Sequence, residues 1–487
     1  MIGKAALLLS GNAATALLTL VRNLVIARLI PVEDYGIAAT FALAMAVVEM
    51  ASAFGLQQQI VQAQDGDDPR FQAALQGFQL LRGLVAGAAL FAAAGPIADF
   101  LNLPDTAWAY RVMAAVPVLT ALQHFDIHRL NRRMAYGPLV LTGTLPAVAA
   151  LAAVWPLYLA FGDWRVMLWT ILLQAALAAL VSHLVAERRF ALRLDRAATL
   201  RAMRFGWPLL LNGALLFLVL YGDRVMVARL LGMAPLAVFS MGVTLTLTPT
   251  LVLDRTTQNL FLPRLSRAAE AGEDGGERFQ TLARAALQAA MLNGAALVLG
   301  TVVFGAVFVR LTLGEKYADL VPLLVPLAIL HAVRVWKTGP AVVALARGQT
   351  GNAMLANLPR AAFLPLGWML LQGGGTLLQL VWLGTLAECL GLAVALVLVR
   401  GRARVRLGPH APALAAGGLF LAVTGALFLL LPGVWPLPVW VQGTVALALF
   451  GLLLATLRDL RRAGRLRKGG PPPSSPPPPA PPEDSLP

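Results

Sequence analysis

Apolar runs of about twenty residues follow one another along nearly the whole chain, separated by short polar or Gly/Pro-rich breaks. A run of that length can cross the ~30 Å hydrocarbon core of a membrane as a helix. Leu and Ala dominate the runs, which is typical of helices. The pattern predicts an all-α integral membrane protein of about 14 spans, at residues 5–30, 36–56, 75–97, 107–123, 138–161, 164–185, 205–231, 236–256, 285–309, 318–340, 352–371, 376–399, 411–431 and 436–457.

The composition supports a membrane protein. Hydrophobic residues make up 58% of the 487 residues, charged residues only 13%, and the mean hydropathy is +0.73. A soluble chain of this size could not hide that much apolar surface. Cys389 is the single cysteine, so no intrachain disulfide or metal cluster is expected, and neither a metal nor a cofactor is predicted. The first apolar run is too long for a signal peptide and favours a retained helix.

Charge is distributed unevenly between the loops. The turns "IPVEDYG", "FGDW", "QGGG" and "LPGVWPLP" are short and poor in Lys and Arg, whereas the alternate connections, such as "HRLNRRMAYG" and "ERRFALRLDRAATLRAMR", are basic. By the positive-inside rule, both termini are expected in the cytoplasm. The acidic loop "QDGDDPR" fits this rule poorly, but acids contribute little to topology. Because the basic residues lie on one side only, the net charge of +15 does not indicate a nucleic-acid partner.

The chain contains an internal repeat. A shift of 201 residues aligns Ile26-Ala27-Arg28-Leu29 with Val227-Ala228-Arg229-Leu230, so that span 1 matches span 7. An even number of crossings separates the copies, which predicts a parallel repeat of two six-helix lobes around a cavity. Chance matching of Leu/Ala/Val-rich helices is the alternative. The expected units are an N-lobe (1–186), a basic linker (187–204), a C-lobe (205–400), spans 13 and 14 (401–458) and a basic, then Pro-rich and disordered tail (459–487).

The repeat also carries a family resemblance. "RNLVIARLIPVEDYG" (22–36) followed by "FGLQQQIVQ" (54–62) resembles the start of bacterial polysaccharide and O-antigen flippases, in the multidrug/oligosaccharidyl-lipid/polysaccharide exporter superfamily. "YGDRVMVARLLGMAPLAVFSMG" (221–242) is similar to the start of their second lobe, although 235–239 lacks the Gly-Tyr pair that is frequent there. The resemblance implies a flippase in the bacterial inner membrane. It would move undecaprenyl-diphosphate-linked oligosaccharide to the periplasm by alternating access, with spans 13 and 14 forming a groove for the polyprenyl chain.

Polar residues within the spans are candidate cavity residues, because they are costly in lipid. Span 1 carries a polar stripe on one helical face, formed by Asn12, Thr15, Thr19 and Arg22. On span 7, Asn212 and Asp223 also share a face. Equivalent positions in the repeat would put Arg22 opposite Asp223. Two interpretations stay open: the two form a gate or bind the cargo headgroup, or each is paired within its own lobe.

Other cations within the spans are candidates for binding the diphosphate, because the planar guanidinium of arginine meets phosphate oxygens bidentately. Arg22, Arg334 and Arg360 are the main candidates, supported by Lys337 and Arg82. Arg82, Asp254 and Arg255 could instead reach the cytoplasmic surface, and His331 could be a packing residue. Glu49 and Glu388 are either ion-coupling sites or counter-ions of arginines.

The sequence leaves several functions open. No Gly-rich phosphate loop and no large periplasmic loop is present, so an enzyme is not predicted. The alternatives are a peptidoglycan lipid precursor flippase, an ion-coupled drug antiporter, and a non-transporting scaffold in envelope polysaccharide assembly. A drug antiporter would require an acid-rich cavity. The expected partners are lipid-linked oligosaccharide and membrane lipid, with polysaccharide polymerase or assembly proteins as further candidates.

Overall fold

The computed structural model describes residues 2–51, 54–270, 273–430 and 439–466, all of them helical or in connections. The first half contains α1 (Ile2–Leu29), α2 (Val32–Ala51), α3 (Leu56–Gln62), α4 (Pro69–Phe100), η1 (Pro104–Thr106), α5 (Ala107–Met113), α6 (Ala115–Ala121), α7 (Asp126–Arg132), α8 (Gly137–Phe161) and α9 (Arg165–Leu184). The second half contains α10 (Arg196–Leu230), α11 (Met233–Glu270), α12 (Glu273–Thr312), η2 (Glu315–Leu320), α13 (Val321–Trp336), α14 (Thr338–Ala346), α15 (Gly351–Ala362), α16 (Leu364–Gln372) and α17 (Leu377–Gly401). After it come η3 (Gly408–His410), α18 (Ala411–Leu430), α19 (Val439–Thr456) and α20 (Arg458–Leu466).

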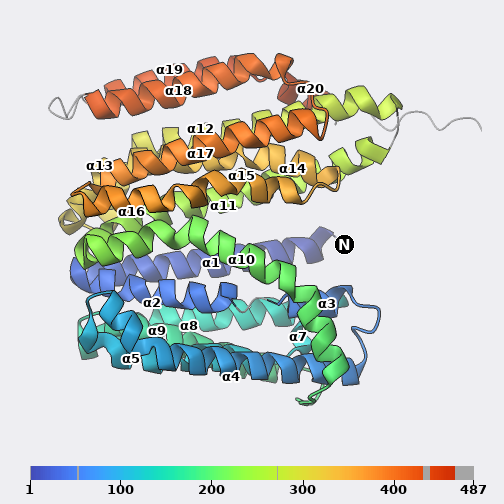
Figure 1. The fold of residues 1–487 in the computed structure, drawn as a ribbon, viewed down its shortest axis with the longest axis vertical. Coiled ribbons are helices and arrows are strands. Elements are labelled where there is room, and N and C mark those ends of the chain that lie inside the picture. The colour runs from blue at the N-terminus through green and yellow to red at the C-terminus, as the bar shows by residue number, and fades with distance from the viewer. Residues whose placement is uncertain (1, 52–53, 271–272, 431–438, 467–487) are drawn as a thin grey trace, which may run out of the picture.

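The long helices lie side by side in one stack (Figure 1). Helices α2 to α9 fill the lower part of the view and α11 to α17 the upper part, with α18 and α19 at the top. Short connections such as those before α2 and α11 gather at one end of the helices, here called the tight-turn end. Helices α3, α7, α14 and α20 gather at the opposite, basic end. This arrangement confirms the predicted all-helical fold with two lobes.

The predicted count of fourteen spans is not confirmed. Within the described residues, ten helices are long and apolar enough to cross a membrane, or eleven if the bent pair Val441–Thr456 and Arg458–Gly464 is one span. Three predicted spans are each broken into two helices, α5/α6, α13/α14 and α15/α16. Each break lies just before a proline. Pro117 and Pro340 have no N–H to donate to the carbonyls of Met113 and Trp336, the last residues of α5 and α13.

Two predicted loops are partly helical. Helix α10 begins at Arg196 and not at 205, and α11 and α12 continue into the segment 263–279. Ala, Glu and Arg, which favour helices, are frequent there. Buried Phe261 and Leu265 of α11 pack with Phe279 and Leu282 of α12, so the extended helices cover each other's apolar faces. Residues 467–487, which include the Pro-rich tail, lie outside the described residues.

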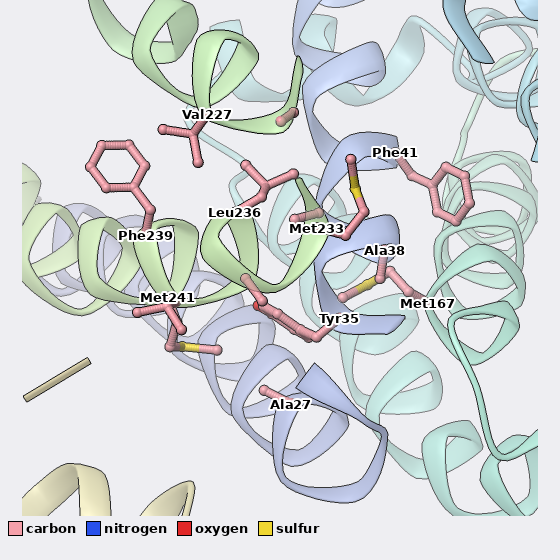
Figure 2. Close-up of a cluster of buried hydrophobic side chains, with 14 of the residues drawn as sticks. Ala27, Tyr35, Ala38, Phe41, Met167, Val227, Met233, Leu236, Phe239 and Met241 are labelled. Carbon is pink, nitrogen blue, oxygen red and sulfur yellow. The ribbon is translucent and has the colours of Figure 1, made fainter. Parts of the chain in front are cut away.

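The two copies of the repeat meet at the tight-turn end. Ile26, Ala27 and Ile30 of the first copy and Val227, Ala228 and Leu236 of the second are almost fully buried in one core. Figure 2 shows Tyr35, Ala38 and Phe41 of α2 in the same cluster as Met233, Leu236 and Phe239 of α11. A Cβ at Gly36 would collide with the backbone carbonyl of Met233, so only glycine permits this approach of α2 to α11. The lobes are therefore closely packed at this end.

The basic end of the first lobe is held by α10. Arg201 binds Asp65 through two hydrogen bonds of 2.8 and 2.7 Å, and Ala202 is buried against Phe71 and Phe78. Helix α10 also contacts α11, α15 and α16 of the second lobe. One helix thus contacts both lobes (Figure 1).

Candidate functional site

A cluster of buried charges lies within the second lobe, where four helices meet. Arg334 is in the last turn of α13, and Lys337 follows it at the break before α14. Arg360 is in the last turn of α15, which ends before Pro365. Glu388 is in the middle of α17, and Asp223 comes from the second half of α10. Three of the five residues therefore lie at helix breaks that are followed by prolines.

Glu388 is the centre of this cluster and is 0% exposed. Its Oε1 accepts hydrogen bonds from Arg334 Nε at 3.0 Å and Arg334 Nη2 at 2.7 Å. Its Oε2 lies 2.6 Å from Lys337 Nζ. Arg360 Nε is 3.8 Å from Oε1, slightly beyond hydrogen-bond range. Three cations therefore surround one carboxylate, which is how Glu388 can be charged without contact with water.

Arg360 has a second acid beside it. Its Nη2 donates to Asp223 Oδ2, and Arg360 itself is only 3% exposed. Lys337 Nζ also donates to Asn357 Oδ1 at 2.9 Å. A Cβ at Gly384, one turn before Glu388, would collide with the Arg360 guanidinium, so this glycine makes room for the cation. With three cations and two acids, these five side chains carry a net charge of +1.

The cluster borders a cavity of about 180 Å³. Arg334, Lys337 and Asn357 line it on one side, and Asp254 lines it together with Thr338, which donates a 2.6 Å hydrogen bond to that carboxylate. The remaining lining comes from α10, α14, α15 and α17 and is mostly apolar. The site can therefore present two cations to a small anionic group while the rest of the cluster holds them in place.

The structure gives Arg22 and Asp223 separate partners, so it does not contain the predicted ion pair between them. Arg22 is 7% exposed; its Nη1 donates to Gln174 Oε1 of α9 at 2.5 Å, and its Nε and Nη2 lie 3.4 and 3.3 Å from Asn23 Oδ1. Asp223 accepts from Arg360, as described above. Each is thus bound within its own lobe, which was the second interpretation of the sequence. The physical reason is proximity: polar partners on adjacent helices of the same lobe satisfy both charges.

The polar stripe of α1 forms most of its described hydrogen bonds within its own helix. The Thr15 and Thr19 hydroxyls donate to carbonyls of their own helix, Gly11 O at 3.0 Å and Thr15 O at 2.9 Å. Thr15 also lies against Gly143 of α8, and Asn12 is exposed. The side chain of Asn212 lies outside the described residues. The hydroxyls of the stripe are thus bonded within α1, which packs on α8, and the role of the stripe in lining a cavity stays a prediction.

The other candidate charges lie apart from the cluster. Arg82 of α4 and the exposed Glu49 of α2 line a second cavity in the first lobe, and Coulombic attraction links them. His331 Nδ1 is 2.9 Å from Thr246 Oγ1, with the ring 2% exposed, which fits the packing interpretation. Arg255 is exposed at the surface.

Sequence reasoning missed a second network, at the basic end. Asp126 of α7 is 0% exposed and binds Arg129 Nε at 2.5 Å, and it also accepts from the backbone N–H of Glu187 at 2.8 Å. Burial raises the pKa of Asp126, but these hydrogen bonds outweigh burial and lower it to about 2. Burial lowers the pKa of neighbouring His128 to about 4. The loop after α9 is thereby tied to α7.

Comparison with known proteins places this arrangement in a family. A family model described as polysaccharide biosynthesis protein matches residues 25–322, which is more than half of the chain. The chain belongs to this family. Among solved structures, this family member resembles the lipid II flippase MurJ in an inward closed conformation, with a TM-score of 0.69 and 12% identity over 94% of this chain and 100% of that one.

A multidrug resistance MATE family transporter of the MOP superfamily in an inward-facing conformation has a TM-score of 0.65 and 15% identity, covering 80% of the family member and 94% of that chain. A MOP superfamily transporter from Pyrococcus furiosus, with a TM-score of 0.53 and 15% identity, covers 82% and 94%. These likenesses show the fold of MOP superfamily transporters. A search of curated proteins finds no match.

Proposed function

We propose that this protein is a flippase that moves a lipid-linked oligosaccharide with a diphosphate headgroup across the bacterial inner membrane. The buried cationic cluster of the second lobe carries the proposal. Arg334, Lys337 and Asp254 are the charged residues of the cavity lining, which therefore carries a net charge of +1. A buried site with excess positive charge attracts an anion and repels a cationic drug. Membership in a polysaccharide biosynthesis family supports a saccharide-bearing cargo.

In this mechanism the diphosphate displaces Glu388 as partner of Arg334 and Lys337. Arginine can offer two parallel N–H donors to phosphate oxygens, while lysine supplies a point charge. Glu388 returns to these cations when the cargo leaves, so that the empty cavity never holds three unpaired charges. Glu388 acts here as a counter-ion, and Glu49 is assigned the same role beside Arg82. Arg22, bound to Gln174, is assigned to the first lobe's side of the transport route.

We place the basic end in the cytoplasm, with both termini there, because the connections at that end carry the arginines. The close packing of the repeat copies at the tight-turn end then corresponds to closure toward the periplasm. A membrane potential of 100 mV, negative inside, favours outward movement of two negative charges by roughly 4–5 kcal/mol. Export is therefore driven by potential, and alternating access exposes the cluster to each side in turn.

The test is a flipping assay with purified protein in liposomes. Each cargo carries a fluorophore that a membrane-impermeant quencher destroys only in the outer leaflet. We expect the protein to flip lipid-linked oligosaccharide, and Arg334→Gln to slow flipping by about tenfold or more, as expected for losing a charge-assisted contact of about 1.5–3 kcal/mol. The matched control is Arg310→Gln, because Arg310 is exposed and its acidic neighbour is 3.9 Å away.

The same liposomes separate the competing functions. Peptidoglycan precursor lipid also carries a diphosphate. Preferential flipping of that lipid would show that the precursor, and not an oligosaccharide lipid, is the cargo. Transport of a cationic dye, with no flipping of either lipid, would make the protein a drug antiporter. No movement of any of the three would leave the scaffold function. An unchanged rate after the potential is collapsed would remove the potential as driving force.

A further inference from the structure

A long apolar groove lies along the first lobe between α2, α4 and α10. Its volume is about 660 Å³. On α4 the part of its lining beyond Arg82 ends at Phe100, and this part spans about 27 Å at 1.5 Å per residue. That length matches the ~30 Å thickness of a hydrocarbon core. Met203 and Val225 of α10 line the side toward the second lobe.

The groove opens into a second, more polar pocket toward the basic end. This pocket has a volume of about 450 Å³ and shares Val48, Phe54, Arg82 and Ala86 with the groove. Its other lining includes the carboxylate Glu49 and the exposed amides Gln57 and Gln58. Arg82 therefore lies where an apolar channel changes into a chamber of amide, carboxylate and guanidinium groups. The pocket and groove together are amphipathic along one axis, as a lipid is.

The sequence had favoured spans 13 and 14 for the polyprenyl chain. In the structure, the pocket described against α18 and α19 has a volume of only about 20 Å³. That is room for about one water molecule, so this pocket does not hold a polyprenyl chain. The groove of α2, α4 and α10, in contrast, has the length that a polyprenyl chain spanning the membrane requires.

We propose that this groove and pocket are the entry site for the cargo: a polyprenyl tail lies along α4, its diphosphate meets Arg82, and the first sugar meets Glu49, Gln57 and Gln58. The assignment rests on the proposed function. Carboxylates and side-chain amides are suitable hydrogen-bond partners of sugar hydroxyls, and a guanidinium is suited to phosphate. With the basic end in the cytoplasm, a lipid of the cytoplasmic leaflet has its headgroup at the pocket and its tail directed toward the opposite face.

Shape selects the polyprenyl chain over ordinary acyl chains. Surrounding lipid is as apolar as the groove, so burial in the groove brings no hydrophobic gain and only packing discriminates. Three alanines, Ala86, Ala89 and Ala93, lie along the middle of the α4 side at spacings of three and four residues. Their small side chains leave room for the methyl branches of a polyprenyl chain. The charged end at Arg82 then fixes the direction in which the chain lies.

The test is photo-crosslinking of the full-length protein in liposomes, using a sugar-free polyprenyl diphosphate with a diazirine in its tail. Mass spectrometry is expected to locate the label on α4 and α10 of the wild-type protein. Excess unlabelled polyprenyl diphosphate is expected to abolish the labelling. The same excess of phosphatidylglycerol is expected to leave the labelling unchanged. If the phospholipid competes equally well, or the label lies on α18 and α19, the assignment is overturned and the groove holds only surrounding lipid.

Matched variants sharpen the result. Ala89→Trp fills the groove and is expected to lower crosslinking by about tenfold, whereas Ala88→Trp is not, because exposed Ala88 is outside the lining of the same helix. Arg82→Gln is expected to lower labelling by a similar factor, with exposed Arg70→Gln of α4 as its control. Equal effects of Ala88→Trp and Ala89→Trp would count against the groove.

The outcomes distinguish this site from the proposed function. If the wild-type protein is labelled in the groove but flips no lipid-linked oligosaccharide, the function fails and the lipid site remains. If it flips oligosaccharide with Ala89→Trp at the wild-type rate and labelling lies elsewhere, the function remains and the entry site is wrong.

Discussion

Replacing Glu388 by glutamine tests how the second lobe tolerates its buried cations. The side chain keeps its shape but loses its charge, and the net charge of the five residues rises from +1 to +2. Breaking a buried ion pair by removing one partner costs about 3–5 kcal/mol. Lys337 retains Asn357, and Arg334 borders the cavity, so we expect the lower limit, about 3 kcal/mol of unfolding free energy.

A second substitution isolates the charge. Lys337→Met in the Glu388→Gln background returns the net charge of the cluster to +1. We expect this second change to recover about half of the lost unfolding free energy, because one of the mutually repelling cations has been removed. Glu315→Gln is the control for the same chemical change, because Glu315 is 80% exposed and should matter by at most about 1 kcal/mol.

Unfolding in mixed detergent micelles, followed by tryptophan fluorescence, measures these differences. Flipping in liposomes adds a functional measurement: if Glu388 competes with the diphosphate, Glu388→Gln binds cargo more tightly and releases it more slowly. The reasoning would be refuted if Glu388→Gln were as stable as the Glu315 control, or if Lys337→Met destabilised the double variant further.

Three further predictions follow from other contacts. Gly384→Ala should reduce flipping and stability, because the new Cβ would collide with the Arg360 guanidinium. The control Gly418→Ala, whose Cβ would have no heavy atom near it, should be neutral or stabilising by about 0.5–1 kcal/mol. Wild-type behaviour of Gly384→Ala would contradict the close contact. The double variant Arg22→Asp with Asp223→Arg should restore none of the activity lost in the single variants, because the two residues are not paired. The double variant Asp223→Arg with Arg360→Asp should regain part of the stability lost in either single variant. The opposite pattern would place Arg22 beside Asp223. Because the pKa of His128 is about 4 when folded and about 6.5 when unfolded, the unfolded chain binds the extra proton between these values. Stability should therefore fall by about 3 kcal/mol as pH drops from 6.5 to 4, and a His128→Gln variant that keeps the whole pH dependence would exclude this cause.

The order of the helices could be predicted from the sequence because it depends on local properties. A run of apolar residues favours a membrane helix whatever its neighbours are, and a proline weakens a helix wherever the chain goes next. Arg334, Lys337, Arg360 and Glu388 were identified for the same reason: a charge inside an apolar run is visible without the fold. The "Gly384-x-x-x-Glu388" spacing was the one local signal for the cluster that sequence reasoning overlooked.

Partner choice was decided by the tertiary structure. Arg22 and Asp223 occupy equivalent positions in the repeat, yet one is bound to Gln174 and the other to Arg360, because each lobe brings its own α9 or α15 closer than the opposite lobe. The groove between α2, α4 and α10 likewise depends on α10 contacting both lobes, which no periodicity within a helix encodes. Apolar runs and prolines determine helices locally, so their effects can be predicted from the sequence. Ion pairs and cavities depend on distances between helices remote in sequence, which packing alone fixes.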